Sequence, residues 1–228
     1  MADQMILTAL TPGPLAVQLL ATATGALLLT AVLLLWRRSI SGAAGLLAVQ
    51  GLALAGLSLV AAAQGEPHLY AAAALLTLVK AVVIPELVLR TARAVHAGIE
   101  ATPVVNPTTG MLLAALLTTV AFLVARPLVA DSASGTAAAV PVGIAVVLIG
   151  FLELATRRQA LAQVIGFVMV DNGIGATAVL ASGGLPVIIE LGVLFDVLLV
   201  VLILVVLTRR IQAAFATTEL HELSELRD

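Results

Sequence analysis

The sequence predicts an all-α, polytopic transmembrane bundle of about seven helices. Of its 228 residues, 61% are hydrophobic and 11% are charged, and the mean hydropathy is +1.18. A soluble domain carries roughly 45–50% apolar and about 25% charged residues, so one soluble core cannot hide this excess of apolar surface. Apolar stretches of about 20 residues, the length that a helix needs to cross a bilayer, recur along the chain.

Seven stretches have the length and composition of membrane-spanning helices. They are residues 15–36, 42–63, 68–89, 108–130, 137–156, 162–182 and 186–208. Arginine pairs and turns rich in Gly, Pro or Asn separate them, and the connections are short. We divide the chain into five N-terminal spans (1–156), a C-terminal pair of spans (157–211) and a short acidic tail (212–228). The tail either docks onto a partner or is solvated.

The basic residues predict the orientation of the bundle. Nine arginines lie in alternate connections or in the C-terminal tail: Arg37, Arg38, Arg90, Arg93, Arg157, Arg158, Arg209, Arg210 and Arg227. Arg126 lies near the opposite side, and Lys80 lies within a span. Because cytoplasmic connections are enriched in Lys and Arg, the N-terminus is expected outside and the C-terminus in the cytoplasm. An odd number of spans requires the same arrangement.

Several chemistries are excluded by composition. The chain has no cysteine, so it forms no disulfide, thiolate zinc site or cysteine-ligated iron–sulfur cluster. No basic block with interleaved aromatic residues indicates a nucleic-acid partner. No Ser/His/Asp set, phosphate-binding glycine loop or metal-ligand spacing occurs. We therefore predict no catalytic site and no cofactor in this chain.

Six ionisable residues fall within the predicted spans, where a charge at the bilayer centre costs about 2.5–3.5 kcal/mol. They are Lys80, Glu86, Glu153, Asp171, Glu190 and Asp196. The helix rise places Lys80, Asp171 and Asp196 each roughly 13–18 Å from the cytoplasmic helix end, near the middle of an approximately 30 Å hydrocarbon core. These three groups are expected to share one polar layer. Glu190 lies closer to the outer face, and the remaining two glutamates lie closer to the inner face.

Two of the glutamates have a simpler explanation. Glu153 and Arg157 are spaced i,i+4 at a helix end, which favours an ion pair on the surface. Glu86 has the same spacing to Arg90, and it either forms that pair or extends towards the interface.

The other four ionisable groups also have structural alternatives. Lys80 could be a counter-ion without a transport role, and Glu190 could be held by contacts between subunits. Asp171 and Asp196 are too short to reach the interface, so we expect a polar function or a subunit contact for them. Pro85 follows Lys80 within the same span and predicts a kink, which serves either gating or packing.

The last third of the chain carries the motifs Gln163-Val164-Ile165-Gly166, Asp171-Asn172-Gly173, Glu190-Leu191-Gly192, Asp196 and Arg209-Arg210. With these motifs the chain resembles component E of the group 4 membrane-bound [NiFe] hydrogenases, of the formate hydrogenlyase type. The resemblance covers most of the chain and is strongest from Arg157 onward. The acid before Asn-Gly is commonly Glu in that family and is Asp171 here. The segment LVKAVVIP (78–85) is similar to the third span of the family, which carries Lys80 and Pro85 over.

The last three spans, residues 137–211, also resemble the K-type subunit of respiratory complex I and the C subunit of Mrp antiporters. Those relatives carry two membrane carboxylates on consecutive helices. An ungapped match from Arg157 places the first carboxylate at Val168, so Asp171 lies about one helical turn further on. The second carboxylate falls on Asp196.

The resemblance implies a non-catalytic membrane-arm subunit of a hydrogenase-like oxidoreductase complex in the inner (plasma) membrane of a prokaryote. Its partners would be an antiporter-like subunit and the membrane anchor of the hydrogenase arm. The nickel, the iron–sulfur clusters and the active site would belong to partner subunits. Proton or sodium translocation coupled to electron transfer would use Lys80, Asp171, Glu190 and Asp196, with Glu86 and Glu153 as secondary positions. The alternatives are a purely structural scaffold, a subunit of an Mrp-type cation/proton antiporter, and an independent small-solute transporter.

Overall fold

The computed structural model describes residues 14–62, 68–94, 105–130 and 136–182, and the single positions 192, 195, 199 and 203. The elements in these ranges are all helices. In chain order they are α2 (Pro14–Trp36), α3 (Ile40–Ala62), α4 (His68–Thr77), the π-helix η1 (Leu78–Val83), α5 (Ile84–Ala94), α6 (Pro107–Ala130), the 3-10 helix η2 (Ala137–Ala139), α7 (Val140–Thr156) and α8 (Ala160–Ser182).

Five helices in the described ranges are long and apolar enough to cross a membrane. They are Leu15–Trp36, Ile40–Val60, Pro107–Ala130, Ala137–Thr156 and Ala160–Ala181. These helices confirm the all-α membrane bundle and coincide closely with five of the seven predicted spans. The predicted span at residues 68–89 corresponds to the run α4–η1–α5. The predicted span at residues 186–208 lies outside the described ranges, apart from the four single positions.

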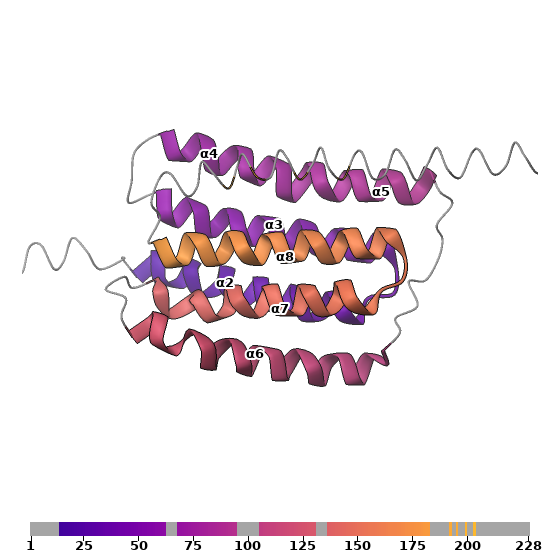
Figure 1. The fold of residues 1–228 in the computed structure, drawn as a ribbon. Helices are drawn as coiled ribbons and strands as arrows, with labels where there is room; N and C mark the ends of the chain where they lie inside the picture. Colours follow the sequence, from indigo (N-terminus) through magenta and orange to yellow (C-terminus); the bar gives the residue numbers. More distant parts are fainter. Residues whose placement is uncertain are drawn as a thin grey trace, which may run out of the picture.

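The helices lie side by side (Figure 1). When the continuous run α4–η1–α5 is taken as one helix, consecutive long helices run in opposite directions. Helices α2, α3, α7 and α8 form the centre, where α7 packs on α8 and on α2, and α3 packs on α2 and on α8. Helix α6 lies at one edge against α7 and α2. The run α4–η1–α5 lies at the other edge against α3. This order places η1 against α3, at the edge of the bundle, and the Lys80 side chain reaches from there to α8.

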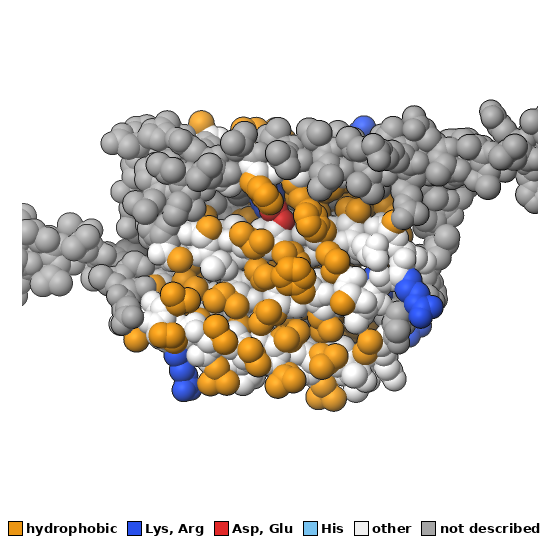
Figure 2. Space-filling model, viewed as in Figure 1, with side chains coloured by type: hydrophobic (Ala, Val, Ile, Leu, Met, Phe, Trp, Pro, Cys, Tyr) orange, Lys and Arg blue, Asp and Glu red, His pale blue; other side chains and the backbone are white. Residues whose placement is uncertain are grey.

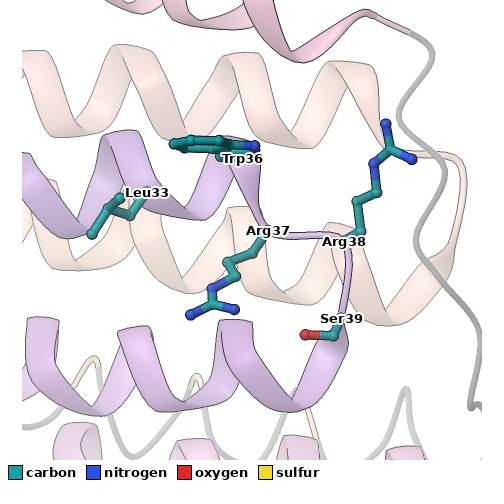
Figure 3. Close-up of a pocket in the computed structure, with 5 residues that line it drawn as sticks. All are labelled: Leu33, Trp36, Arg37, Arg38 and Ser39. Atoms are coloured by element: carbon teal, nitrogen blue, oxygen red, sulfur yellow. The ribbon is translucent and has the colours of Figure 1, made fainter.

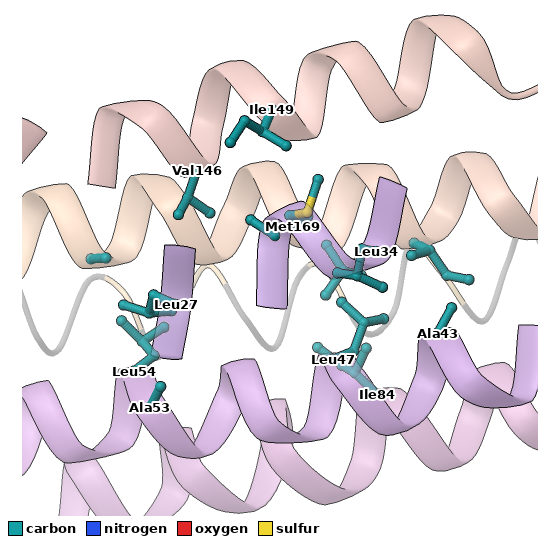
Figure 4. Close-up of a cluster of buried hydrophobic side chains, with 14 of the residues drawn as sticks. Leu27, Leu34, Ala43, Leu47, Ala53, Leu54, Ile84, Val146, Ile149 and Met169 are labelled. Atoms are coloured by element: carbon teal, nitrogen blue, oxygen red, sulfur yellow. The ribbon is translucent and has the colours of Figure 1, made fainter. Parts of the chain in front are cut away.

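The core consists of aliphatic side chains at heptad spacing. Leu27 and Leu34 are seven residues apart on α2, as Leu47 and Leu54 are on α3, and all four are fully buried. They meet side chains of α7 and α8, including Met169 (Figure 4). Many large hydrophobic side chains are exposed on the described helices, and apolar side chains are spread over the described part of the face in Figure 2. A helix that is apolar on all sides is typical of a bundle surrounded by lipid.

Glycines bring α7 and α8 into close contact. Gly143 and Gly150 are seven residues apart on α7, and Gly166 and Gly173 are seven apart on α8. A Cβ atom at any of the four would lie 2.6–2.9 Å from a backbone nitrogen of the facing helix. Small residues that let two backbones approach are a common means of packing helices in membranes. The close contact fixes the height at which α8 presents its polar residues.

The described arginines are separated between the two ends of the bundle. Arg37-Arg38 follow α2 and Arg157-Arg158 follow α7, and these two helix ends lie together because the Arg157 side chain bonds carbonyls at the end of α2. Helix α5, with Arg90 and Arg93, ends at the same end of the bundle (Figure 1). Arg126 lies near the end of α6, at the opposite end. For the arginines within the described ranges, the predicted alternation of basic connections is thus present; Arg209, Arg210 and Arg227 lie outside those ranges.

Candidate functional site: a buried ion pair between helices

Lys80 comes from the π-helical segment η1. The amide of Ile84 donates to the carbonyl of Val79, the i to i−5 bond that defines this geometry. Pro85 follows directly and carries no amide hydrogen, so it cannot continue the series of donors. Directly before Pro85, where the sequence predicts a kink, the structure has a local π-helix inside the run from α4 to α5. It lies at the lysine, whose side chain is buried in the bundle.

Lys80 and Asp171 form a buried ion pair. The Lys80 ammonium contacts Oδ2 of Asp171, and it also donates to Oδ1 of Asn172 at 3.0 Å. Lys80 is 3% exposed and Asp171 is 5% exposed. Because a buried charge is costly unless it is paired and hydrogen-bonded, the contact explains how both groups stay in an apolar bundle. The prediction that these two residues share one layer is confirmed.

Two amide side chains extend this network across the bundle. Nδ2 of Asn172 donates to Oε1 of Gln50 at 2.9 Å, and Nε2 of Gln50 donates to the carbonyl of Leu27 at 3.5 Å. The chain of contacts therefore links η1, α8, α3 and α2. Sequence reasoning gave Gln50 no role, although it is the one amide side chain within the predicted span 42–63. An amide isolated in an apolar span is the signal that could have identified it.

Gly51 allows α3 to approach η1 at the height of the ion pair. A Cβ atom at this position would lie 2.6 Å from both the carbonyl carbon and the carbonyl oxygen of Lys80, and 2.8 Å from the amide nitrogen of Ala81. Only glycine leaves room for this approach. Because Gln50 is the preceding residue on α3, the same approach brings its amide to Asn172.

We expect Gly51→Ala to lower the free energy of unfolding by about 1–3 kcal/mol, because the new methyl group displaces the η1 backbone. Gly45→Ala is the matched control on the same helix, since nothing lies within 4 Å of a Cβ atom there. The control should be neutral or stabilising by about 0.5–1 kcal/mol, the usual gain over a helical glycine. Thermal unfolding of both variants in detergent compares them, and equal effects would contradict the packing described here.

Arg157 forms a second polar cluster at the arginine-rich end. Its Nε donates to Oε1 of Glu153 at 2.8 Å, and its Nη2 donates to the carbonyls of Arg37 at 3.0 Å and Leu35 at 3.2 Å. The last carbonyls of a helix have no partner within the helix and carry partial negative charge. The guanidinium therefore satisfies the end of α2 and joins it to the end of α7.

The predicted surface pair of Glu153 with Arg157 is half correct. The ion pair exists, but its position is wrong, because each residue is only 3% exposed. The end of α2 covers the pair, which the spacing along α7 alone does not reveal. Oε2 of Glu153 is buried and has no hydrogen-bond partner among the residues that the structure describes. The Glu86–Arg90 pair is confirmed at 2.9 Å, and both side chains are exposed.

The remaining predicted site residues, Glu190 and Asp196, lie outside the described residues. Their place in the polar layer stays a prediction. Within the part of the chain that the structure describes, the layer thus consists of Lys80, Asp171, Asn172 and Gln50.

Fold and site together define a polytopic helical membrane protein with an ion pair held among apolar helices. The chain belongs to the family of the Uncharacterized protein Rv0085 of Mycobacterium tuberculosis, with which it shares 41% identity over 208 residues, 90% of this chain and 94% of that protein. Hydrogenase-4 component E of Escherichia coli K12 is 27% identical over 207 residues, 89% of this chain and 94% of that protein. This distant match supports the resemblance to hydrogenase component E. No family model and no solved structure matches.

Proposed function

We propose that the chain is a non-catalytic membrane-arm subunit of a hydrogenase-like complex, and that it takes part in proton or sodium translocation coupled to electron transfer. The observation that carries the proposal is the Lys80–Asp171 pair, buried among helices long enough to span a membrane. The similarity to a protein named hydrogenase-4 component E supports the kind of complex. Ionisable residues inside a membrane bundle typically mark ion pathways.

The geometry suggests how the pair would act. Protonation of Asp171 removes the negative charge that holds the ammonium, while Oδ1 of Asn172 remains an acceptor for Lys80. Gln50 keeps the Asn172 amide oriented through its bond to Nδ2. The ammonium can then move without losing every partner, and the aspartate can pass its proton on. When a proton binds to Asp171 and later leaves it, the charge of this aspartate on α8 is coupled to the position of the Lys80 ammonium.

Further carboxylates complete the proposed path. Glu190 and Asp196 are the partners expected from the sequence, and their separation of six residues corresponds to about 9 Å along a helix, so water or a neighbouring helix must bridge them. Glu153 is a secondary position, supported by its buried Oε2 atom, which has no hydrogen-bond partner in the described part of the chain. The Glu86 carboxylate is exposed and bonded to Arg90, so it is a secondary position at the periphery.

The proposal includes a place in the membrane arm. The tight α7–α8 pair with residues 186–208 would form a three-helix unit like the K-type subunit of complex I and the Mrp C subunit. The separated arginines support an external N-terminus and a cytoplasmic C-terminus in a prokaryotic plasma membrane. An antiporter-like subunit and the anchor of a formate hydrogenlyase-type electron-transferring arm would be its neighbours.

Asp171→Asn and Asp196→Asn, each made in the assembled complex, test the function. We expect both to abolish ion translocation into inverted membrane vesicles while co-purification of partner subunits and electron transfer persist. Unlike leucine, asparagine at position 171 keeps an oxygen that accepts from the Lys80 ammonium, so the complex should still assemble. Glu86→Gln should lower translocation far less, because its carboxylate is exposed and lies at the periphery of the path. If the variants lose partner subunits and the complexes that do assemble still translocate ions, the two aspartates have a scaffold role instead. Translocation by the chain without oxidoreductase partners would show an antiporter subunit or an independent transporter.

A further inference from the structure

A pocket of about 530 Å³ opens at the turn from α2 to α3 (Figure 3). Its lining residues are Leu33, Trp36, Arg37, Arg38 and Ser39. The volume is within the range of about 300–1,000 Å³ that small-molecule sites occupy. The pocket lies at the arginine-rich end of the bundle, separate from the Lys80–Asp171 layer.

The lining changes from apolar to basic towards the end of the bundle. Leu33 and Trp36 belong to the last turns of α2, and the arginines and Ser39 follow in the connection. Trp36 is exposed, and it is the only tryptophan of the chain. Aromatic rings and arginines in this order are typical of the level at which lipid headgroups meet acyl chains. The pocket therefore has the polarity of an amphiphile placed parallel to α2.

The guanidinium groups of Arg37 and Arg38 are available to a ligand, whereas the backbone of the turn is held by hydrogen bonds. The amide of Arg37 donates to the carbonyl of Leu33 at 3.1 Å, and the carbonyl of Arg37 accepts from Nη2 of Arg157 at 3.0 Å. Within the described ranges, neither the Arg37 nor the Arg38 side chain forms an ion pair. The buried Arg157 cluster thus positions a turn with two exposed and uncompensated positive charges.

We propose that this pocket binds the headgroup phosphate of an anionic phospholipid, with an acyl chain alongside Leu33 and Trp36. The planar guanidinium groups suit phosphate oxygens, and the Ser39 hydroxyl adds a donor. Basic pockets beside transmembrane helices commonly recognise anionic headgroups. A free phosphate ion would use the arginines alone and would leave the apolar half of the pocket empty, so the lining favours the lipid.

The single tryptophan provides a reporter inside the site. The full-length chain is placed in phosphatidylcholine nanodiscs to which one of two brominated lipids is added, either phosphatidylglycerol or phosphatidylcholine. The bromine atoms on the acyl chains quench tryptophan fluorescence on contact. We expect brominated phosphatidylglycerol to quench half of the fluorescence at a lower mole fraction than brominated phosphatidylcholine does. This preference for the anionic lipid should amount to about fivefold for each arginine that contacts the headgroup. The double variant Arg37→Gln/Arg38→Gln should lose the preference.

The matched control is Arg90→Gln/Arg93→Gln, which removes the same charge from the same end of the bundle. This control should keep the preference for phosphatidylglycerol. The proposal would be overturned if the two lipids quench the wild-type chain equally, or if Arg37→Gln/Arg38→Gln keeps the preference. It would also be overturned if the control loses the preference to the same extent as Arg37→Gln/Arg38→Gln. Inorganic phosphate added to the wild-type nanodiscs should leave the preference unchanged, and abolition of the preference would show a site for a soluble anion instead.

Discussion

Lys80→Met is expected to lower the free energy of unfolding by about 3–5 kcal/mol, the usual cost of removing one partner of a buried ion pair. Methionine has a similar length and no charge, so the change leaves Asp171 buried without its cation. It also removes the donor to Oδ1 of Asn172. Unfolding of the purified chain in detergent with increasing denaturant, followed by far-ultraviolet circular dichroism, measures the loss.

The double variant Lys80→Met/Asp171→Leu separates the unpaired charge from lost packing. Replacing both partners of a buried pair by apolar residues is often neutral or stabilising, so we expect most of the stability to return. The single variant Asp171→Leu should be as unstable as Lys80→Met, because it leaves an unpaired ammonium. Equal stability of both single variants and the parent chain would contradict a buried pair. A stable double variant without translocation would assign a functional role to the two charges.

Arg157→Met is expected to have an effect of similar size, about 3–5 kcal/mol. The substitution leaves the Glu153 carboxylate buried without its cation. It also removes the donor to the carbonyls of Leu35 and Arg37. Arg158→Met is the matched control, because the neighbouring arginine is exposed. The control should be stable to within about 0.5 kcal/mol, as surface substitutions usually are.

A further variant divides the Arg157 effect between its partners. In Arg157→Met/Glu153→Met the unpaired carboxylate is absent, so the remaining loss reflects the end of α2. We expect about 1–3 kcal/mol to remain, the usual cost of leaving a buried acceptor without a donor. Full recovery in the double variant would show that the α2 carbonyls find other donors, and that Arg157 does not join α2 to α7.

The sequence was sufficient for features that depend on distance along the chain. Apolar length predicted the five spans that the structure describes, and arginine spacing predicted which connections share an end of the bundle. The helix rise placed Lys80 and Asp171 at the same depth, and the structure brings them into contact. Depth in a bundle of nearly parallel helices is a one-dimensional quantity, so the position of a residue within its span largely determines it.

The tertiary structure alone decided which side chains face each other at a given depth. Burial of the Glu153–Arg157 pair depends on α2, more than a hundred residues away along the chain, and the role of Gln50 depends on α3 meeting α8. Gly51 sets that meeting by admitting the Lys80 backbone. The five long helices are apolar on all sides, so no polar face in the sequence indicates how each of them is rotated or which helices it packs against.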